Sequence, residues 1–246
     1  MQPRLSYAIV GVQRSGTTLL CESLKSTGIA GVPGEYFLSW EDGSWAQENF
    51  VATRQEFLDL VIEKGTTPNG VFGINIMWNT FSKETAPRLR ELPGLERFPR
   101  HLLLQQIFPN LRFIWIIRRN KVRQAVSWSI AGQTDIWSSH ELAHRKPKHK
   151  PVFDFHMIDG LHRLILQGES GWAKYFSDCG TEPFKLFYED LAESYKSKTL
   201  EILQYLGIAV PNDLRIGEVP VKKQADTVND EWTMKYLEMK QAEQSA

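Results

Sequence analysis

Tyr7-Ala8-Ile9-Val10-Gly11-Val12 is continuously apolar, and Gln13-Arg14-Ser15-Gly16-Thr17-Thr18 follows it directly. An apolar run without polar alternation is typical of a parallel strand that is covered on both faces. The residues from Leu19 to Leu24 then repeat at helical spacing, so this part of the chain predicts a strand, a tight loop and a helix. The spacing of Gly11 and Gly16 in this setting is that of a phosphate-binding loop, in which backbone N–H groups at a helix N-terminus hold oxyanions.

The residue after Gly16 limits the class of ligand that this loop can bind. A loop that binds a nucleoside triphosphate places Lys there to hold the β- and γ-phosphates, whereas this chain has Thr17. Arg14 inside the loop supplies a charge that suits a shorter 5′ group. The structural alternative is a tight glycine turn capped by Ser15, and the alternative function is a P-loop kinase-like phosphotransferase, which Thr17 disfavours.

Further apolar stretches predict strands that alternate with helices. The clear candidates are Gly70–Met77, Leu111–Ile117 and Phe184–Tyr188, and a short one covers Ile29–Val32. Helical spacing follows several of them, as between Met157 and Phe176. We therefore expect an α/β fold with a central, mostly parallel sheet flanked by helices, which binds its ligands at the carboxyl ends of the strands.

Length and composition exclude several classes of protein. The chain has 246 residues, of which 42% are hydrophobic, and 29 basic residues balance 29 acidic ones. This length suits one domain spanning residues 1–246, and the balanced charge argues against a nucleic-acid binder. No apolar run approaches the ~18 residues that a membrane span needs. Cys21 and Cys179 are too few for a disulfide framework, so we expect a cytoplasmic protein.

The stretch from Gln133 to Pro151 is too polar and charged to pack, and we expect a mobile loop at 133–151. It contains His140-Glu141-Leu142-Ala143-His144, which matches the zinc-protease pattern HExxH. That pattern needs a sustained, buried helix, and Pro147 ends any helix here within a turn. The sequence therefore favours a site without metal.

A second candidate anion site follows the apolar stretch Leu111–Ile117. Arg119 is followed eight residues later by Ser127 on the next predicted helix. Roughly two and a quarter helical turns bring that hydroxyl back to the face of the strand end, where Arg119 and Ser127 can hold one phosphate. Together with the loop around Arg14, this pair predicts a nucleotide that carries phosphates at two separate ends.

These two elements resemble those of the sulfotransferases. Gln13–Thr18 is similar to the 5′-phosphosulfate loop, and Arg119–Ser127 to the 3′-phosphate element, of enzymes that use 3′-phosphoadenosine 5′-phosphosulfate (PAPS). Within that superfamily the chain is similar to the trehalose 2-sulfotransferase family, from about residue 7 to 238. Further stretches that carry the similarity are Gly28–Phe37, Pro68–Gly73, Met77–Asn79, Gln224–Asp226 and Asp230–Trp232. The resemblance implies a P-loop-like sulfotransferase fold, PAPS as co-substrate and no metal.

The resemblance also implies roles for individual residues. Those expected to bind the donor are Arg14, Ser15, Gly16, Thr17, Thr18, Arg119, Ser127, Lys223 and Gln224. Glu35, which follows the short Ile29–Val32 candidate, matches the carboxylate proposed as general base, and Arg14 is expected to assist it in catalysis. Those expected beside the acceptor are Tyr36, Phe37, Trp78 and Trp137. Tyr188-Glu189-Asp190-Leu191 resembles a strand-end motif of sulfotransferases, with an Asp helix cap as the alternative.

Two positions depart from the family pattern. Asn75 stands where the family has Lys, and Lys223 stands where it has Arg, which keeps the charge but loses the bidentate fork. The missing cation at Asn75 leaves a nucleotide-binding module without turnover as the alternative to an enzyme. The function implied by the resemblance is transfer of a sulfuryl group from PAPS to a hydroxyl of a carbohydrate or glycolipid, carried out by a homodimer.

Overall fold

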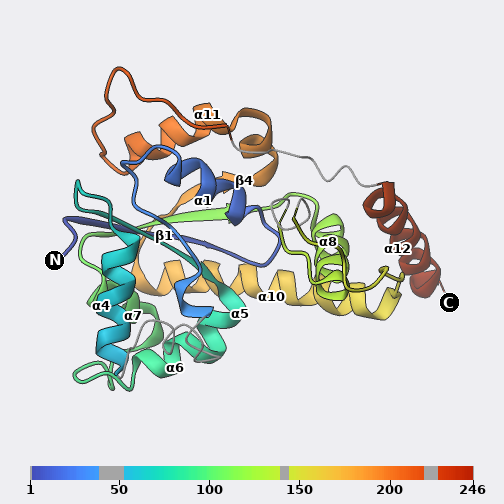
Figure 1. Ribbon diagram of the computed structural model, residues 1–246. Coiled ribbons are helices and arrows are strands. Elements are labelled where there is room, and N and C mark those ends of the chain that lie inside the picture. Colours follow the sequence, from blue (N-terminus) through green and yellow to red (C-terminus); the bar gives the residue numbers. More distant parts are fainter. Residues whose placement is uncertain (1, 39–52, 139–143, 219–226, 246) are drawn as a thin grey trace.

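The computed structural model of the protein describes residues 2–38, 53–138, 144–218 and 227–245. Its centre is a sheet of four parallel strands in the order β2-β1-β3-β4 (Figure 1). The strands are β1 (Leu5–Gly11), β2 (Val71–Met77), β3 (Leu111–Ile117) and β4 (Phe184–Phe187). Helices cover both faces of this sheet, and the expected α/β fold with a parallel sheet is confirmed.

The helices form two layers and a lateral group (Figure 1). One face of the sheet carries α4 (Arg54–Gly65), α5 (Trp78–Thr80), the π-helical turn η2 (Phe81–Thr85), α6 (Ala86–Leu89), α7 (Arg100–Ile107) and α10 (Phe155–Cys179). The other face carries α1 (Thr17–Lys25) and α11 (Tyr188–Tyr205), while α8 (Lys121–Thr134) and α12 (Thr227–Ser245) lie beyond the carboxyl ends of the strands. Within the described residues, no helix is both long and apolar enough to cross a membrane.

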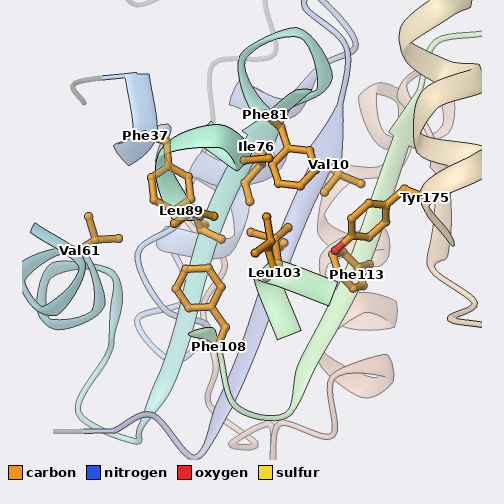
Figure 2. Close-up of a cluster of buried hydrophobic side chains, with 14 of the residues drawn as sticks. Val10, Phe37, Val61, Ile76, Phe81, Leu89, Leu103, Phe108, Phe113 and Tyr175 are labelled. Atoms are coloured by element: carbon orange, nitrogen blue, oxygen red, sulfur yellow. The ribbon is translucent and has the colours of Figure 1, made fainter. Parts of the chain in front are cut away.

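The larger hydrophobic core lies between the sheet and the layer of α4, α7 and α10. Figure 2 shows Val10, Ile76 and Phe113 of the strands facing side chains of these helices. The cluster is rich in aromatic rings, and the rings of Phe113 and Tyr175 meet edge to face with centroids 5.7 Å apart. Alternate residues of the same strands point to the opposite face, which explains why the strands read as unbroken apolar runs.

A second core lies under α1 and α11, and a third joins the lateral helices. In the second core, Tyr7 and Ile9 of β1 pack against Leu20 and Leu24 of α1. The third cluster, which includes Tyr236 of α12, binds α12 to α8 and α10. Helices therefore cover both faces of the inner strands β1 and β3.

The expected strand at Ile29–Val32 is wrong. Gly28 and Gly31 both have positive φ, at 68° and 71°, which interrupts an extended conformation. The segment instead lies along the outer edge of β2, where the Asn75 N–H donates to the Gly34 carbonyl at 2.9 Å. This edge contact brings the residue after Gly34 to the side of the sheet.

The described flanks of the 133–151 stretch are tied to each other. The Gln133 side-chain amide donates to the Val152 carbonyl at 3.0 Å, and its oxygen accepts from the Val152 N–H at 2.8 Å. Asp135 also forms an ion pair with Lys148 at 2.7 Å. His140–Ala143 of the HExxH stretch lie outside the described residues, and the mobility of 133–151 stays a prediction.

Candidate active site

The loop between β1 and α1 has the backbone geometry of an anion cradle. Arg14 and Gly16 adopt positive φ values of 65° and 97°, and the Ser15 N–H donates to the Val12 carbonyl at 3.1 Å. These turns place the first N–H groups of α1 at the carboxyl end of β1, as a phosphate loop requires. The Ser15 hydroxyl is buried and has no hydrogen-bond partner within the described chain, which fits a ligand oxygen.

Position 16 requires glycine for two reasons: its backbone φ is positive, and Tyr188 leaves no room for a side chain. A Cβ atom at this position would lie 2.3 Å from Cδ2 of Tyr188. Tyr188 begins α11 directly after β4, so the aromatic residue of the Tyr188–Leu191 motif packs on the loop. The alternative of an Asp helix cap is wrong, because Asp190 lies inside the first turn and Phe187 occupies the N-cap.

Two buried side chains hold the loop from the other side. The Trp172 indole N–H of α10 donates to the Gly11 carbonyl at 2.9 Å, in the core. The Gln124 amide of α8 donates to the Gln13 carbonyl at 2.8 Å, and Gln124 is fully buried. Neither contact is expected from the sequence, in which Gln124 is only part of the Arg119–Ser127 stretch and Trp172 falls within the helical spacing between Met157 and Phe176.

Arg14 connects the loop to α8 and to the chain that follows it. Its Nε–H donates to the Ser127 hydroxyl at 3.0 Å, and its Nη1 donates to the Trp137 carbonyl. Two residues expected at opposite ends of the donor are therefore in direct contact. Thr17 is buried at the start of α1, whereas Thr18 is exposed beside it.

Arg119 lies at the end of β3 and is held by the first turn of α11. Its guanidinium forms a bidentate ion pair with Asp190, at 2.7 and 2.8 Å, and stacks 4.3 Å above the Phe187 ring. Its backbone N–H donates to the Glu189 carboxylate at 3.0 Å. Arg119 and Ser127 are not hydrogen-bonded to each other here, and their shared phosphate stays a prediction.

Arg118 is a further cation of this site that sequence reasoning left without a role. Its side chain is half-buried over the Tyr188 ring, at 4.9 Å, and its Nη1 lies 3.5 Å from the Arg14 carbonyl. Burial lowers the pKa of this guanidinium from its ordinary value. The signal in the sequence was its place directly after the apolar run of β3, one residue before Arg119.

Glu35 lies beside β2, on the face of the sheet that α1 covers. The Asn75 amide donates to its Oε1 at 3.3 Å, and Asn75 pairs in register with Ile9, two residues before β1 ends at Gly11. Burial raises the pKa of Glu35 to about 7. A carboxyl group with a pKa near neutrality is suited to take and release a proton.

The residues expected beside the acceptor divide into two groups. Trp78 is half-buried directly after β2, and Trp137 is 39% exposed after α8. Tyr36 is half-buried, and its hydroxyl donates to the Val32 carbonyl at 2.6 Å. Phe37, by contrast, is 3% exposed and lies in the larger core (Figure 2), where its ring stacks on Phe57, so it is not available to an acceptor.

Two residues expected at the donor, Lys223 and Gln224, lie outside the described residues. Within the part of the chain that the structure describes, no group of three or more His, Cys, Asp or Glu side chains could hold a metal ion.

Solved structures share this fold over nearly the whole chain. The solved sulfotransferase from Alicyclobacillus acidocaldarius is similar with a TM-score of 0.50 and 15% identity, covering 96% of this chain and 95% of that one. The sulfotransferase domain from the curacin biosynthetic pathway is similar with a TM-score of 0.50 and 11% identity, covering 93% and 83%. At such low sequence identities, these similarities show only that the fold is shared.

Sequence similarity is more specific. The trehalose 2-sulfotransferase of Mycobacterium tuberculosis is 28% identical, over 94% of this chain and 93% of that protein. The trehalose 2-sulfotransferase of Mycolicibacterium smegmatis is 30% identical, over 94% of both. The model of the Stf0 sulphotransferase family matches residues 6–239. Because this match covers almost the entire chain, the protein belongs to the Stf0 sulphotransferase family.

Proposed function

We propose that the protein transfers a sulfuryl group from PAPS to a hydroxyl group of a carbohydrate. The observation that carries the proposal is the position of Glu35 relative to the phosphate loop. Asn75, which bonds Glu35, lies beside β1 only two residues before the loop begins, a separation of about 7 Å along the strand. An anion cradle and a carboxyl of near-neutral pKa thus lie near the carboxyl ends of two adjacent strands, β1 and β2.

The loop supplies what the donor end of the reaction needs. In the transfer, the acceptor oxygen forms a bond to sulfur while the bond from sulfur to the phosphate oxygen of the donor breaks. The leaving phosphate gains negative charge, which the loop N–H groups and the Arg14 guanidinium stabilise. Arg119 and Ser127 hold the 3′-phosphate, and Lys223 and Gln224 complete the donor site.

Glu35 supplies what the acceptor end needs. As the acceptor oxygen attacks, its proton passes to a Glu35 carboxylate oxygen, so that no high-energy oxonium forms. We expect Tyr36, Trp78 and Trp137 beside the acceptor, and the exposed indole ring of Trp137 offers a face on which a sugar ring can stack. The names of the two mycobacterial relatives support a carbohydrate acceptor, with a glycolipid as a larger version of the same chemistry.

The test is incubation with 35S-labelled PAPS and a panel of mono- and disaccharides, trehalose included. We expect labelled sulfate on at least one sugar. Tight donor binding without transfer to any member of the panel would favour a binding module instead. Transfer of phosphate from labelled ATP would favour a kinase. We also propose a homodimer, which sedimentation of the purified chain tests.

A further inference from the structure

Asn75 is a buried polar residue in the middle of an otherwise apolar strand. It is 3% exposed, and it pairs in register with Ile9, which packs against α1. Its backbone N–H donates to the Gly34 carbonyl at 2.9 Å, and its side-chain Nδ2 donates to Glu35 Oε1 at 3.3 Å. Two successive residues of the Gly34–Glu35 segment are thus held by one residue of β2.

The other half of this amide is unused. Asn75 Oδ1 is buried and has no hydrogen-bond partner within the described chain. Buried acceptors without a partner are rare, because desolvation is then left uncompensated. A half-turn of the amide about its last side-chain bond would exchange Nδ2 and Oδ1 and present the acceptor to Glu35.

Among the described residues, the groups around Glu35 carry no opposite charge that would replace this amide. Cys21 of α1, Tyr7 of β1 and the neighbouring Tyr36 are the titratable groups on this side, and burial raises the pKa of each, that of Tyr36 to about 12. The charged residues near Cys21 on α1, Lys25 and Glu22, form an ion pair with each other at 2.9 Å. Within the described residues, the amide of Asn75 is the polar side chain that bonds Glu35.

We propose that Asn75 is the positioning residue of Glu35 and that its amide serves both protonation states of the carboxyl. Before transfer, the Nδ2–H group donates to the carboxylate. When the acceptor O–H bond breaks and the proton moves to Glu35, the new carboxylic acid donates to Oδ1. A cation at this position could only donate, and it would hold the carboxyl in its ionised, weakly basic form. This inference rests on the proposed function, because it assigns the proton to Glu35.

The test compares Asn75→Lys and Asn75→Leu with the wild type. The pKa of Glu35 is read from the pH titration of 13C-labelled glutamate by NMR without donor, with the resonance assigned by Glu35→Gln. We expect Asn75→Lys to lower this pKa by about 1–3 units and Asn75→Leu to raise it, because the carboxylate loses its donor. Gln106→Lys is the matched control, since it adds the same charge at an exposed position of α7.

Turnover is then measured against pH. The rising limb of the profile should move down in Asn75→Lys and up in Asn75→Leu, while donor affinity stays within a few-fold in Asn75→Leu, which adds no charge near the phosphate loop. If Asn75→Lys does not fold, Asn75→Leu decides, because it is close in volume and apolar. A Glu35 pKa equal to that of the wild type in the folded variants would overturn the inference. Full turnover of Glu35→Gln would instead contradict the proposed base, and the NMR titration would still decide the role of Asn75.

Discussion

Among the described residues, Glu35 has the neutral amide of Asn75 as its polar partner and no nearby cation. Removing the charge of Glu35 therefore breaks no ion pair among these residues. Glu35→Gln keeps the size and the hydrogen bonding of the side chain but removes the base. We expect turnover to fall by about 10²–10⁴-fold while the dissociation constant of the donor stays nearly unchanged. Single-turnover rates and equilibrium binding of the donor measure the two quantities separately. Turnover within a few-fold of the wild type would show that another group takes the proton.

Burial raises the pKa of Glu35 to about 7, which predicts the pH dependence of the reaction. Only the ionised carboxylate can accept a proton, so kcat/KM should rise as the pH increases through about 7 and level off above it. Below this value it should fall about tenfold per pH unit. A profile that is flat between pH 5 and 8 would contradict the assignment, as would a rising limb that persists in Glu35→Gln.

Arg119 is held in place by Asp190 but is exposed enough to accept a ligand as well. Arg119→Ala removes charge-assisted hydrogen bonds worth roughly 1.5–3 kcal/mol, so the affinity for PAPS should fall by about tenfold to a hundredfold or more. Adenosine 5′-phosphosulfate lacks the 3′-phosphate, and its affinity should change little. Arg123→Ala is a matched control, because Arg123 pairs with Asp230 of α12. Equal losses for both donors would rule out the proposed role.

At the scale of elements, the loop and the first turn of α11 depend on each other through Gly16. Gly16→Ala combines a positive φ of 97° with a contact of 2.3 Å to Tyr188. Gly28→Ala is the control, because its φ is also positive, at 68°, but nothing lies within 4 Å of the new Cβ. The control should lose about 1–2 kcal/mol of stability, and Gly16→Ala should lose more and bind the donor weakly. Urea unfolding and donor titration measure both, and equal behaviour would mean that Tyr188 moves aside without cost.

The elements that could be predicted are those with one dominant physical signal. β3 was expected and found at Leu111–Ile117, because the five apolar residues from Phe113 to Ile117 form a run that is short for a helix and typical of a buried parallel strand. α4 and α7 were missed, since both mix polar residues among few buried ones. The strand expected at Ile29–Val32 failed because composition does not report the positive φ of Gly28 and Gly31.

The sequence predicted the individual parts of the site better than the contacts between them. The loop around Arg14 carries a local signal, because glycine spacing and a following helix suffice to identify it. The bond between Arg14 and Ser127 joins residues 113 positions apart, and that between Asn75 and Glu35 joins residues 40 apart. Such pairs depend on strand order and register, which no local pattern contains. Phe37 shows the same limit of local patterns. It follows Glu35 and Tyr36 in the sequence, which suggests a place in the site, but its side chain packs in the hydrophobic core.

At the scale of the whole molecule, α12 lies at one end of the fold beside α8 (Figure 1), and Tyr236 is its most deeply buried aromatic side chain. Tyr236 is 2% exposed, its ring stacks on Phe155 with centroids 5.2 Å apart, and its hydroxyl donates to Asp159 at 2.8 Å. Tyr236→Ala should therefore lower the free energy of unfolding by about 3–5 kcal/mol. Leu237→Ala, at a position that is 41% exposed, should cost less than about 1 kcal/mol. Chemical denaturation measures both, and equal losses would mean that α12 is not anchored through Tyr236.

The central place of β1 in the sheet determines when it can pair during synthesis. Ser6 pairs with Phe72 on one side and with Leu111 on the other, so both partners emerge from the ribosome long after β1 itself. At about 5–20 residues per second, roughly a hundred residues take some 5–20 s to be made. Until then this strand, which is buried along its whole length in the folded protein, has no neighbours, and parallel pairing over such distances is slow. β1 is therefore the segment where we expect chaperones to bind and aggregation to begin.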